Sequence, residues 1–396
     1  MHPCIGMHTT RKLAARDGRF FMAMTSPVLC AKLRALPSGE ICQAMSRFWT
    51  KLAAGLSPYV PGEQPRGERL VKLNTNENPY PPAPGVLAAI AGTSGNSLRR
   101  YPDPDSSELR AAFARREGLS PGQVFLGNGS DEVLAHTFQG LLKHERPLAF
   151  PDISYSFYPV WSALYEIEFT QVPLTADFRV DVQAFPQDCG SIIIPNPNAP
   201  TGVLLGLDEI RQLLRHHADA VVVIDEAYID FGGESATRLI PEHDNLLVVQ
   251  TASKSRSLAG LRVGAAFGQE QLIEALVRIK DSFNSYPMDV VSQRAMLASL
   301  ADEQWFSDCC ERVIQTRERT ATRMQALGFA VLPSAANFLF ASHPQVAAGE
   351  LFAALRERQI IVRYFDKPRI SEFLRISIGT DEDMDAMLRA LEDILA

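Results

Sequence analysis

A lysine and an aspartate that follow two hydrophobic segments are the residues best suited to covalent chemistry. Lys254 lies in the loop sequence Thr-Ala-Ser-Lys-Ser-Arg-Ser, directly after the apolar segment 246–250. Asp225 ends the apolar segment 221–224, and Tyr228 comes three residues later. A lysine amine can form a Schiff base with an aldehyde, and a poorly solvated carboxylate can pair with a protonated pyridine nitrogen. The combination predicts pyridoxal phosphate (PLP) chemistry, with Tyr228 placed to reach the ring hydroxyl.

Each residue of this pair has a less specific interpretation when it is taken alone. A lysine in a serine-rich loop is typical of a solvated surface. An aspartate after a strand is typical of a helix cap, or of a metal ligand in a nucleotide-binding protein. The metal interpretation requires a Gly-x-x-x-x-Gly-Lys-Ser/Thr loop, which the chain lacks. The order and spacing of Asp225 and Lys254 therefore favour PLP.

Two polar loops offer groups for other parts of such a cofactor. The segment Gly127-Asn-Gly-Ser-Asp-Glu132 lies between an expected strand and an expected helix, where backbone amides can bind a phosphate. It is equally compatible with an ordinary turn and an aspartate helix cap. Ser253 and Arg262 are expected to complete the phosphate site. In Pro195-Asn-Pro-Asn-Ala-Pro-Thr-Gly202 an asparagine amide can donate to a phenolate oxygen, although a simple Pro/Gly loop has the same appearance.

Two arginines near the C-terminus lie in or beside apolar segments. Arg375 is part of Phe373-Leu-Arg-Ile-Ser, and Arg363 follows Ile360-Ile-Val. A charged side chain in such a setting needs a partner. That partner is either a substrate carboxylate, which matches the planar guanidinium, or an internal carboxylate in a salt bridge.

Composition limits the class of protein. The 396 residues are 46% hydrophobic and 21% charged, which is ordinary for a globular chain long enough for two domains. The formal net charge of −7 predicts no nucleic-acid partner. No apolar run approaches the roughly 20 residues that cross a bilayer, so we expect no membrane span. Six scattered cysteines without metal-ligand spacing predict reduced thiols in a cytoplasmic enzyme and no metal site.

Short apolar strands alternate with amphipathic helices from residue 124 onward. We expect strands at 124–126, 147–150, 168–172, 191–194, 221–225, 246–250 and 264–267, with helices at 131–142, 156–164 and 207–216. This alternation predicts an α/β fold whose central sheet is mostly parallel and covered by helices on both faces. Ligands of such sheets bind beyond the carboxyl ends of the strands, where Asp225, Lys254 and Asn198 lie.

The chain divides into four predicted parts. Residues 1–44 carry six Lys or Arg against two Asp or Glu. We expect them to be an extension that is disordered or not native, with a targeting peptide as the alternative. Residues 45–74 are expected to form an N-terminal arm, 75–290 a large cofactor-binding domain, and 291–396 a smaller C-terminal α/β domain. A long helical stretch over 290–325 is expected to link the two domains.

These motifs, in this order, resemble those of PLP-dependent aminotransferases of fold type I, class II, over residues 45–396. More narrowly, they are similar to the histidinol-phosphate aminotransferases. The motifs that carry the resemblance are Leu73-Asn-Thr-Asn-Glu-Asn-Pro-Tyr, Arg100-Tyr-Pro-Asp, Asn198-Ala-Pro-Thr-Gly, Asp225-Glu-Ala-Tyr, Ser253-Lys-Ser and Leu374-Arg-Ile-Ser-Ile-Gly-Thr. The resemblance implies the PLP-dependent transferase fold and PLP as the cofactor.

The resemblance also implies a role for each site residue by matching position. For the cofactor, Lys254 holds it as a Schiff base, Asp225 pairs with the ring nitrogen, Tyr228 bonds the ring oxygen and Tyr155 stacks on the ring. The amides of Ser130 and Asp131, together with Ser253 and Arg262, hold the phosphate. Tyr101 reaches across a homodimer interface into the neighbouring site. The residues that bind substrate are Tyr59, Asn337, Arg363 and Arg375.

One position departs from the pattern of such aminotransferases. They usually place the asparagine that bonds the ring oxygen directly before Pro-Thr-Gly, where this chain has Ala199. Either Asn198 reaches the ring from one residue earlier, or Tyr228 makes that bond alone.

The resemblance implies a reaction as well. It is the interconversion of L-histidinol phosphate and 2-oxoglutarate with imidazole-acetol phosphate and L-glutamate, by ping-pong kinetics, in histidine biosynthesis. The expected partners are these small-molecule substrates and a second copy of the chain. An aromatic amino acid aminotransferase and a threonine-phosphate decarboxylase are the alternatives. A cofactor-binding regulator is a third, although residues 1–44 are too few for a DNA-binding domain.

Overall fold

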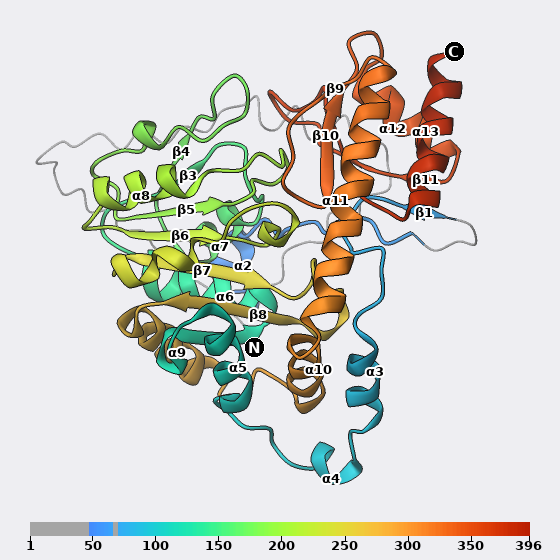
Figure 1. The fold of residues 1–396 in the computed structure, drawn as a ribbon. Helices are drawn as coiled ribbons and strands as arrows, with labels where there is room; N and C mark the ends of the chain where they lie inside the picture. The colour runs from blue at the N-terminus through green and yellow to red at the C-terminus, as the bar shows by residue number, and fades with distance from the viewer. Residues whose placement is uncertain (1–46, 66–69) are drawn as a thin grey trace, which may run out of the picture. The chain divides into compact units, whose positions relative to one another are not determined.

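Seven strands form the central sheet of the protein, which a computed structural model describes over residues 47–65 and 70–396. The strands are β2 (Val124–Asn128), β3 (Leu148–Pro151), β4 (Phe169–Val172), β5 (Ser191–Pro195), β6 (Val221–Asp225), β7 (Leu246–Thr251) and β8 (Val263–Gly268). Their order across the sheet is β2-β8-β7-β6-β5-β3-β4 (Figure 1). The predicted extension, residues 1–44, lies outside the described residues.

Strand direction decides which loops of this sheet meet. Strands β7, β6, β5, β3 and β4 are parallel to one another. Strand β8 runs antiparallel to both of its neighbours, β2 and β7. Because β8 begins at the edge where β2 and β7 end, the residue before it, Arg262, joins the loops at the carboxyl ends of the other strands.

Helices cover both faces of the sheet. Those with buried residues in its hydrophobic clusters are α3 (Pro84–Ala91), α5 (Ser107–Glu117), α6 (Gly129–Thr137), α7 (Tyr158–Tyr165), α8 (Leu207–His216), α9 (Glu270–Phe283) and α10 (Val290–Leu300). Helices α3, α5, α8 and α10 contribute to one cluster, and α6, α7 and α9 to the other. The chain also contains α2 (Lys51–Gly55) and α4 (Gly95–Leu98).

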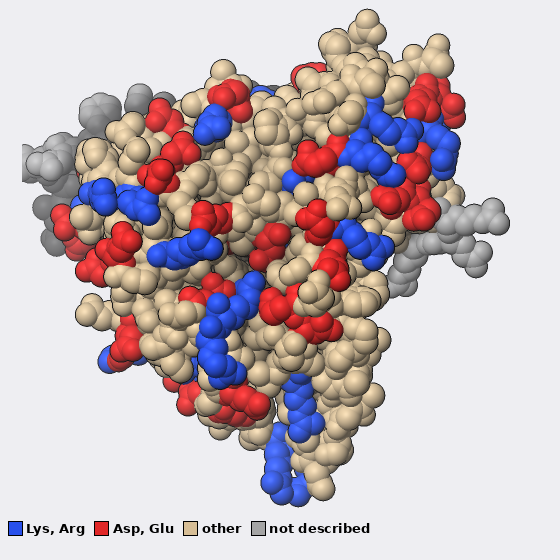
Figure 2. All heavy atoms as spheres, in the orientation of Figure 1, with Lys and Arg blue, Asp and Glu red and all other residues tan. Residues whose placement is uncertain are grey.

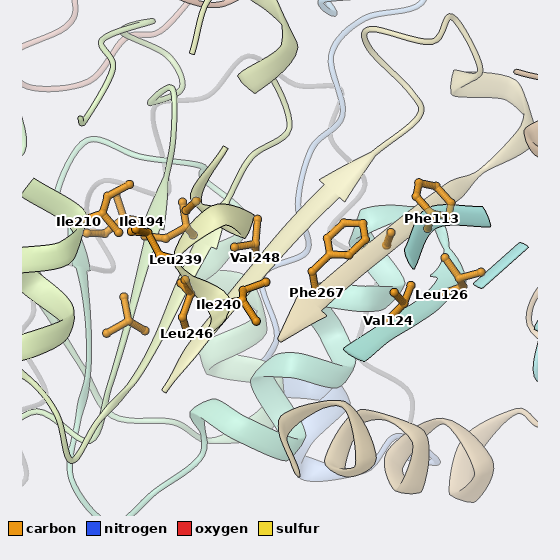
Figure 3. Packing of buried hydrophobic residues seen from close by; sticks show 14 of the residues in the cluster. Phe113, Val124, Leu126, Ile194, Ile210, Leu239, Ile240, Leu246, Val248 and Phe267 are labelled. Atoms are coloured by element: carbon orange, nitrogen blue, oxygen red, sulfur yellow. The ribbon is translucent and has the colours of Figure 1, made fainter. Parts of the chain in front are cut away.

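The sheet is apolar on both faces. Successive side chains of a strand point in opposite directions, so an uninterrupted apolar run supplies apolar side chains to each face. On β7, Val248 belongs to the cluster shared with α8, whereas its neighbour Val249 belongs to the cluster shared with α6. Figure 3 shows the first of these clusters, where Phe267 of β8 and Ile194 of β5 lie among side chains such as Ile210 of α8. Strands buried on both faces explain the uninterrupted apolar runs in the sequence.

A second, antiparallel sheet lies in the C-terminal third of the chain. Its strands are β9 (Ala330–Val331), β10 (Phe338–Ser342), β12 (Arg363–Tyr364) and β13 (Leu374–Ser377), in the order β12-β13-β10-β9. Helices α11 (Glu303–Ala326), α12 (Ala348–Glu357) and α13 (Asp381–Leu395) share its separate hydrophobic core, which includes Leu339, Ile376 and Leu388. Strand β1 (Val71–Lys72) pairs in parallel with β11 (Ile360–Ile361), beside this core (Figure 1). The arm and domain boundaries at residues 74 and 290 stay predictions.

The helical stretch predicted over residues 290–325 is interrupted once. The structure has two helices there, α10 and α11, separated by Ala301 and Asp302. The Asp302 carboxylate accepts a hydrogen bond of 3.1 Å from the amide of Trp305. An aspartate that caps a new helix in this way ends the previous one, and apolar periodicity alone does not detect it.

Charged side chains of both signs are interspersed over the face of the molecule drawn in Figure 2. Neither sign forms a continuous field on that face, in keeping with a chain whose acidic residues only modestly outnumber its basic ones. Within the described residues, none of the helices is both long enough and apolar enough to cross a bilayer.

Candidate active site

A cavity of about 630 Å³ opens at the carboxyl ends of the central strands. Most of the predicted site residues line it, and the exceptions are Tyr101, Asn198 and Asn337. Its wall also includes residues of the second sheet and of the loop that follows β1. The structure therefore gathers side chains that lie hundreds of residues apart in the sequence.

Lys254 extends into this cavity from the loop after β7. Its Nζ donates a hydrogen bond of 3.2 Å to the carbonyl oxygen of Thr75 and lies 5.8 Å from the centre of the Tyr228 ring. The Asn78 amide donates to the carbonyl oxygens of Lys254 and Ser255, at 3.1 Å each. The loop is thus fixed by its backbone, while the lysine amine faces the cavity with a single acceptor among the described residues.

Asp225 ends β6 at the floor of the cavity. Its carboxylate accepts a hydrogen bond of 2.8 Å from the hydroxyl of Tyr158, which is fully buried. Burial raises the pKa of Asp225 to about 6, and the Tyr158 hydrogen bond opposes that rise. A buried carboxyl whose charge is poorly compensated is suited to a cationic partner.

Tyr228 and Tyr155 present aromatic rings to the same space. The Tyr228 hydroxyl accepts a hydrogen bond of 3.0 Å from the amide of Asn76. The Tyr155 hydroxyl donates to the Asp131 carboxylate at 3.2 Å, and its ring packs edge-on against Tyr158 with 5.7 Å between centroids. Burial, followed by the charge of Asp131, raises the pKa of Tyr155 far above its usual range, so the hydroxyl stays a donor.

The first turn of α6 lies at one end of the cavity and offers backbone amides to an anion. Ser130 and Asp131 lie in that turn, where backbone amides are free of helical partners. Arg262 Nη2 lies 3.0 Å from the Asp131 carboxylate, and Ser253 lines the same wall. The backbone of β8 packs closely against the start of α6, since a Cβ on Gly264 would lie 2.4 Å from the Ser130 nitrogen.

Arg363 and Arg375 enter the cavity from the second sheet. Arg375 Nη2 donates to the Asn74 carbonyl oxygen at 2.8 Å, whereas its Nε is buried without a partner. Burial lowers the pKa of Arg375, as does the nearby charge of Arg363. Neither arginine has a carboxylate partner among the described residues, so the internal salt bridge considered from the sequence is not what the structure shows. Tyr59 also lines the cavity and stacks on Phe157 at 4.7 Å.

Three predicted site residues lie elsewhere. The buried Asn198 amide donates to the Ile153 carbonyl oxygen and to the Thr201 hydroxyl, while its neighbour Ala199 lines the cavity. The Asn337 amide donates to the carbonyl oxygen of Asn76, and Asn337 is not among the residues that line the cavity. Tyr101 is 81% exposed and stacks on Tyr286 at 4.6 Å. Their predicted roles toward the cofactor and the substrate stay predictions.

Sequence reasoning missed the particular contacts of Tyr158 and Asn76. Tyr158 comes three residues after Tyr155, and either tyrosine could face Asp225 as far as the sequence shows. Asn76 lies in the Leu73–Tyr80 motif, whose sequence does not show which of its residues contact the site. Its backbone has a positive φ of 54°, and its bond to Tyr228 joins the contacts that Thr75 and Asn78 of the same motif make with Lys254.

Residues 68–391 match the family described as aminotransferase class I and II. This chain belongs to the class I and II aminotransferases. A Pseudomonas putida protein named histidinol-phosphate aminotransferase is 57% identical to this aminotransferase over 347 residues, which cover 88% of this chain and 100% of that protein. The family expected from the sequence is thereby confirmed.

Solved structures agree with the fold. The crystal structure of histidinol-phosphate aminotransferase from Sinorhizobium meliloti, in complex with pyridoxal-5'-phosphate, matches with a TM-score of 0.80 at 25% identity, over 89% of this chain and 98% of that one. L-threonine-O-3-phosphate decarboxylase from Porphyromonas gingivalis matches with a TM-score of 0.72 at 22% identity, over 82% and 99%. The predicted fold class is confirmed, and a shared fold alone does not separate the two reactions.

The residues of the cavity fit PLP, which is the cofactor of this aminotransferase. The amine of Lys254, the buried carboxyl of Asp225 and the backbone amides at the start of α6 surround the same cavity. These groups match the aldehyde, the pyridine nitrogen and the phosphate of PLP, in that order. The buried carboxyl of Asp225, with a pKa raised to about 6, has room for a cation beside it. The expected cofactor is confirmed by the family together with the PLP complex of the Sinorhizobium protein.

Proposed function

We propose that this aminotransferase interconverts L-histidinol phosphate and 2-oxoglutarate with imidazole-acetol phosphate and L-glutamate, a step of histidine biosynthesis. The observation that carries the proposal is 57% identity, over 88% of the chain, to the Pseudomonas putida protein of that name. The cavity supports it, because Arg363 and Arg375 face a space that must accept anionic substrates in both half-reactions.

In this proposal seven residues of the cavity wall hold the ring and the phosphate of the cofactor. Asp225 pairs with the ring nitrogen, Tyr228 donates to the ring oxygen, and Tyr155 covers one face of the ring. The amides of Ser130 and Asp131, with Ser253 and Arg262, bind the phosphate. The position of Asn198 favours the alternative in which Tyr228 serves the ring oxygen without it.

In this proposal Lys254 transfers the proton of the substrate Cα. When bound, PLP supplies an electron sink for the charge that develops at the substrate Cα. The Lys254 amine has one weak acceptor, the Thr75 carbonyl oxygen at 3.2 Å, so it can turn from that oxygen toward the Cα proton. It takes this proton as a general base, holds it at Nζ, and returns it as a general acid.

Arg375 and Arg363 orient the substrate. The unpaired Nε of Arg375 lies buried beside Nη2, so this edge of the guanidinium can bind a carboxylate with parallel hydrogen bonds. Arg363 and Tyr59 line the cavity nearby and serve the second anionic group, a carboxylate in one half-reaction and a phosphate in the other.

The proposal includes a homodimer in the cytoplasm. Tyr101 and Tyr286 form a stacked aromatic pair whose exposed fractions are 81% and 43%, which suits a surface that a second chain covers. Tyr101 of one chain then reaches the site of its partner. Cys189, Cys309 and Cys310 are free thiols, which suits a reducing compartment.

A substrate panel tests the proposal. Purified enzyme loaded with PLP is assayed with 2-oxoglutarate and either L-histidinol phosphate, L-phenylalanine or L-threonine phosphate, with Lys254→Ala as the inactive control. We expect the highest kcat/KM with histidinol phosphate. A preference for phenylalanine, or release of carbon dioxide from threonine phosphate, would replace the proposal with one of its rivals.

A further inference from the structure

Arg363 and Arg375 are placed directly against each other. Strands β12 and β13 pair in antiparallel fashion with Arg363 opposite Arg375 in register. Residues opposite each other in such a pair have Cβ atoms about 5 Å apart, and like charges in that position repel. A nearby carboxylate would normally relieve the repulsion, but among the described residues neither arginine has one. Something else must keep the two guanidinium groups in the cavity.

An aromatic ring occupies the place of that carboxylate. The guanidinium carbons of Arg363 and Arg375 lie 5.3 Å and 5.5 Å from the centre of the Phe365 ring. Arg375 also lies 5.5 Å from the ring centre of Phe338, which is fully buried. The face of an aromatic ring attracts a cation and leaves the N–H edges of the guanidinium free for other acceptors.

The loop that carries Phe365 is itself fastened at the cavity rim. Arg369 forms an ion pair with Asp152 at 2.8 Å. It also donates to the carbonyl oxygens of Leu174 and Thr175, at 2.8 Å and 3.0 Å. Arg369 therefore has the acidic partner that the other two arginines lack. Its contacts fix the segment 365–370 against the loops of the central sheet.

We propose that Phe365 is a positioning residue for both substrates, which holds the guanidinium groups of Arg363 and Arg375 so that their N–H edges face the substrate anions. Without the ring, the two like charges separate, Arg363 loses its aromatic contact, and Arg375 keeps only its contacts with Phe338 and the Asn74 carbonyl oxygen. Both half-reactions share this requirement, because a dicarboxylate and a phosphate ester are both bound through anionic groups. The inference rests on the proposed function for the identity of the substrates only.

The test compares Phe365→Leu with Phe373→Leu in the PLP-loaded enzyme. Phe373 packs in the same hydrophobic cluster and stacks on Phe340 at 4.7 Å, so its replacement controls for loss of a ring that does not contact the arginines. For Phe365→Leu we expect KM to rise about tenfold for both L-glutamate and L-histidinol phosphate, with kcat changed less than about twofold. Phe365→Tyr keeps the aromatic face and should restore KM.

A binding measurement separates this inference from the proposed function. Maleate is a dicarboxylate without an amino group, and its dissociation constant can be measured by calorimetry on wild type and variants. We expect about tenfold weaker binding to Phe365→Leu and unchanged binding to Phe373→Leu. Unchanged maleate binding and KM in Phe365→Leu, or equal losses in the two leucine variants, would overturn the role of Phe365. Failure of the wild type to use histidinol phosphate would overturn the proposed function alone.

Discussion

Asp225 shows how one neighbour decides the charge of a buried group. Burial favours the neutral carboxyl and raises the pKa, whereas the 2.8 Å hydrogen bond from Tyr158 favours the carboxylate and lowers it. The balance, a pKa of about 6, leaves the carboxyl ready to ionise fully once a cation lies beside it. Tyr158 itself remains protonated, since burial and the charge of Asp225 raise its pKa well above the ordinary range.

Tyr158→Phe removes this donor and should raise the pKa of Asp225. A hydrogen bond to a charged group contributes roughly 1.5–3 kcal/mol, and each pKa unit corresponds to about 1.4 kcal/mol. The group must be ionised to pair with the ring nitrogen, so activity should be lost at a higher pH as the solution is acidified. We expect the acidic limb of the kcat/KM profile to move up by about one pH unit.

The control for this variant is Tyr165→Phe. Tyr165 ends the same helix, α7, but is not among the residues that line the cavity. Its pH profile should match that of the wild type. An unshifted acidic limb in Tyr158→Phe would show that the hydrogen bond to Asp225 does not tune this group.

Among the elements, the junction of α6 with β8 is the most sensitive to side-chain volume. Gly129, at the start of α6, has a positive φ of 81° and lies against Arg262. On β8, a Cβ at Gly264 would lie 2.4 Å from backbone atoms of Gly129 and Ser130. Backbone cannot yield as a flexible side chain can, so any residue larger than glycine must displace the start of α6, where we propose that the phosphate binds.

Gly264→Ala should therefore weaken PLP binding by at least about tenfold, because the displaced amides in the first turn of α6 no longer point toward the phosphate. The dissociation constant is measured from the absorbance of the bound cofactor. Gly260→Ala is the matched control, since a Cβ there meets nothing within 4 Å, and it should bind PLP as the wild type does. Equal affinity in both variants would mean that the close approach at Gly264 is not required.

The sequence was sufficient for elements with strong local signals. The helix at 207–216 and the strand at 221–225 have the predicted bounds. In each segment the spacing of the apolar residues indicates the type of element, and polar residues on either side mark where it ends. The break at Asp302 and the antiparallel direction of β8 depend on a single cap and on tertiary pairing, which no local pattern records.

The candidate site shows the same division. Lys254 and Asp225 were predictable because each follows an apolar strand whose carboxyl end must face a ligand. The contacts of Tyr158, Asn76 and Phe365 were not predictable from the sequence. Each depends on a partner more than ten residues away, or on which of several aromatic residues faces inward. The role of Asn198 stays a prediction, since its amide donates to the Ile153 carbonyl oxygen and to the Thr201 hydroxyl.

At the scale of the whole molecule, the cavity is assembled from segments at both ends of the described chain. Tyr59 precedes the first strand, and Arg375 lies on the last one, β13. Yet Tyr101, which we propose reaches the site of a partner chain, is 81% exposed and absent from the cavity of its own chain. In a symmetric dimer the same surface is buried on both partners, so each Tyr101 can complete the other chain's site.

Mixed dimers decide whether Tyr101 acts within its own chain or across to its partner. We expect Lys254→Ala to be inactive and Tyr101→Ala to be strongly impaired. When the two variants are unfolded together in equal amounts and refolded with PLP, half of the dimers should be mixed. A mixed dimer then holds one site with Lys254 from one chain and Tyr101 from the other, so about a quarter of wild-type activity should return. If Tyr101 served its own chain, neither site of a mixed dimer would be complete and no activity would return. A single chain mass in sedimentation, or full activity of Tyr101→Ala, would contradict the shared site directly.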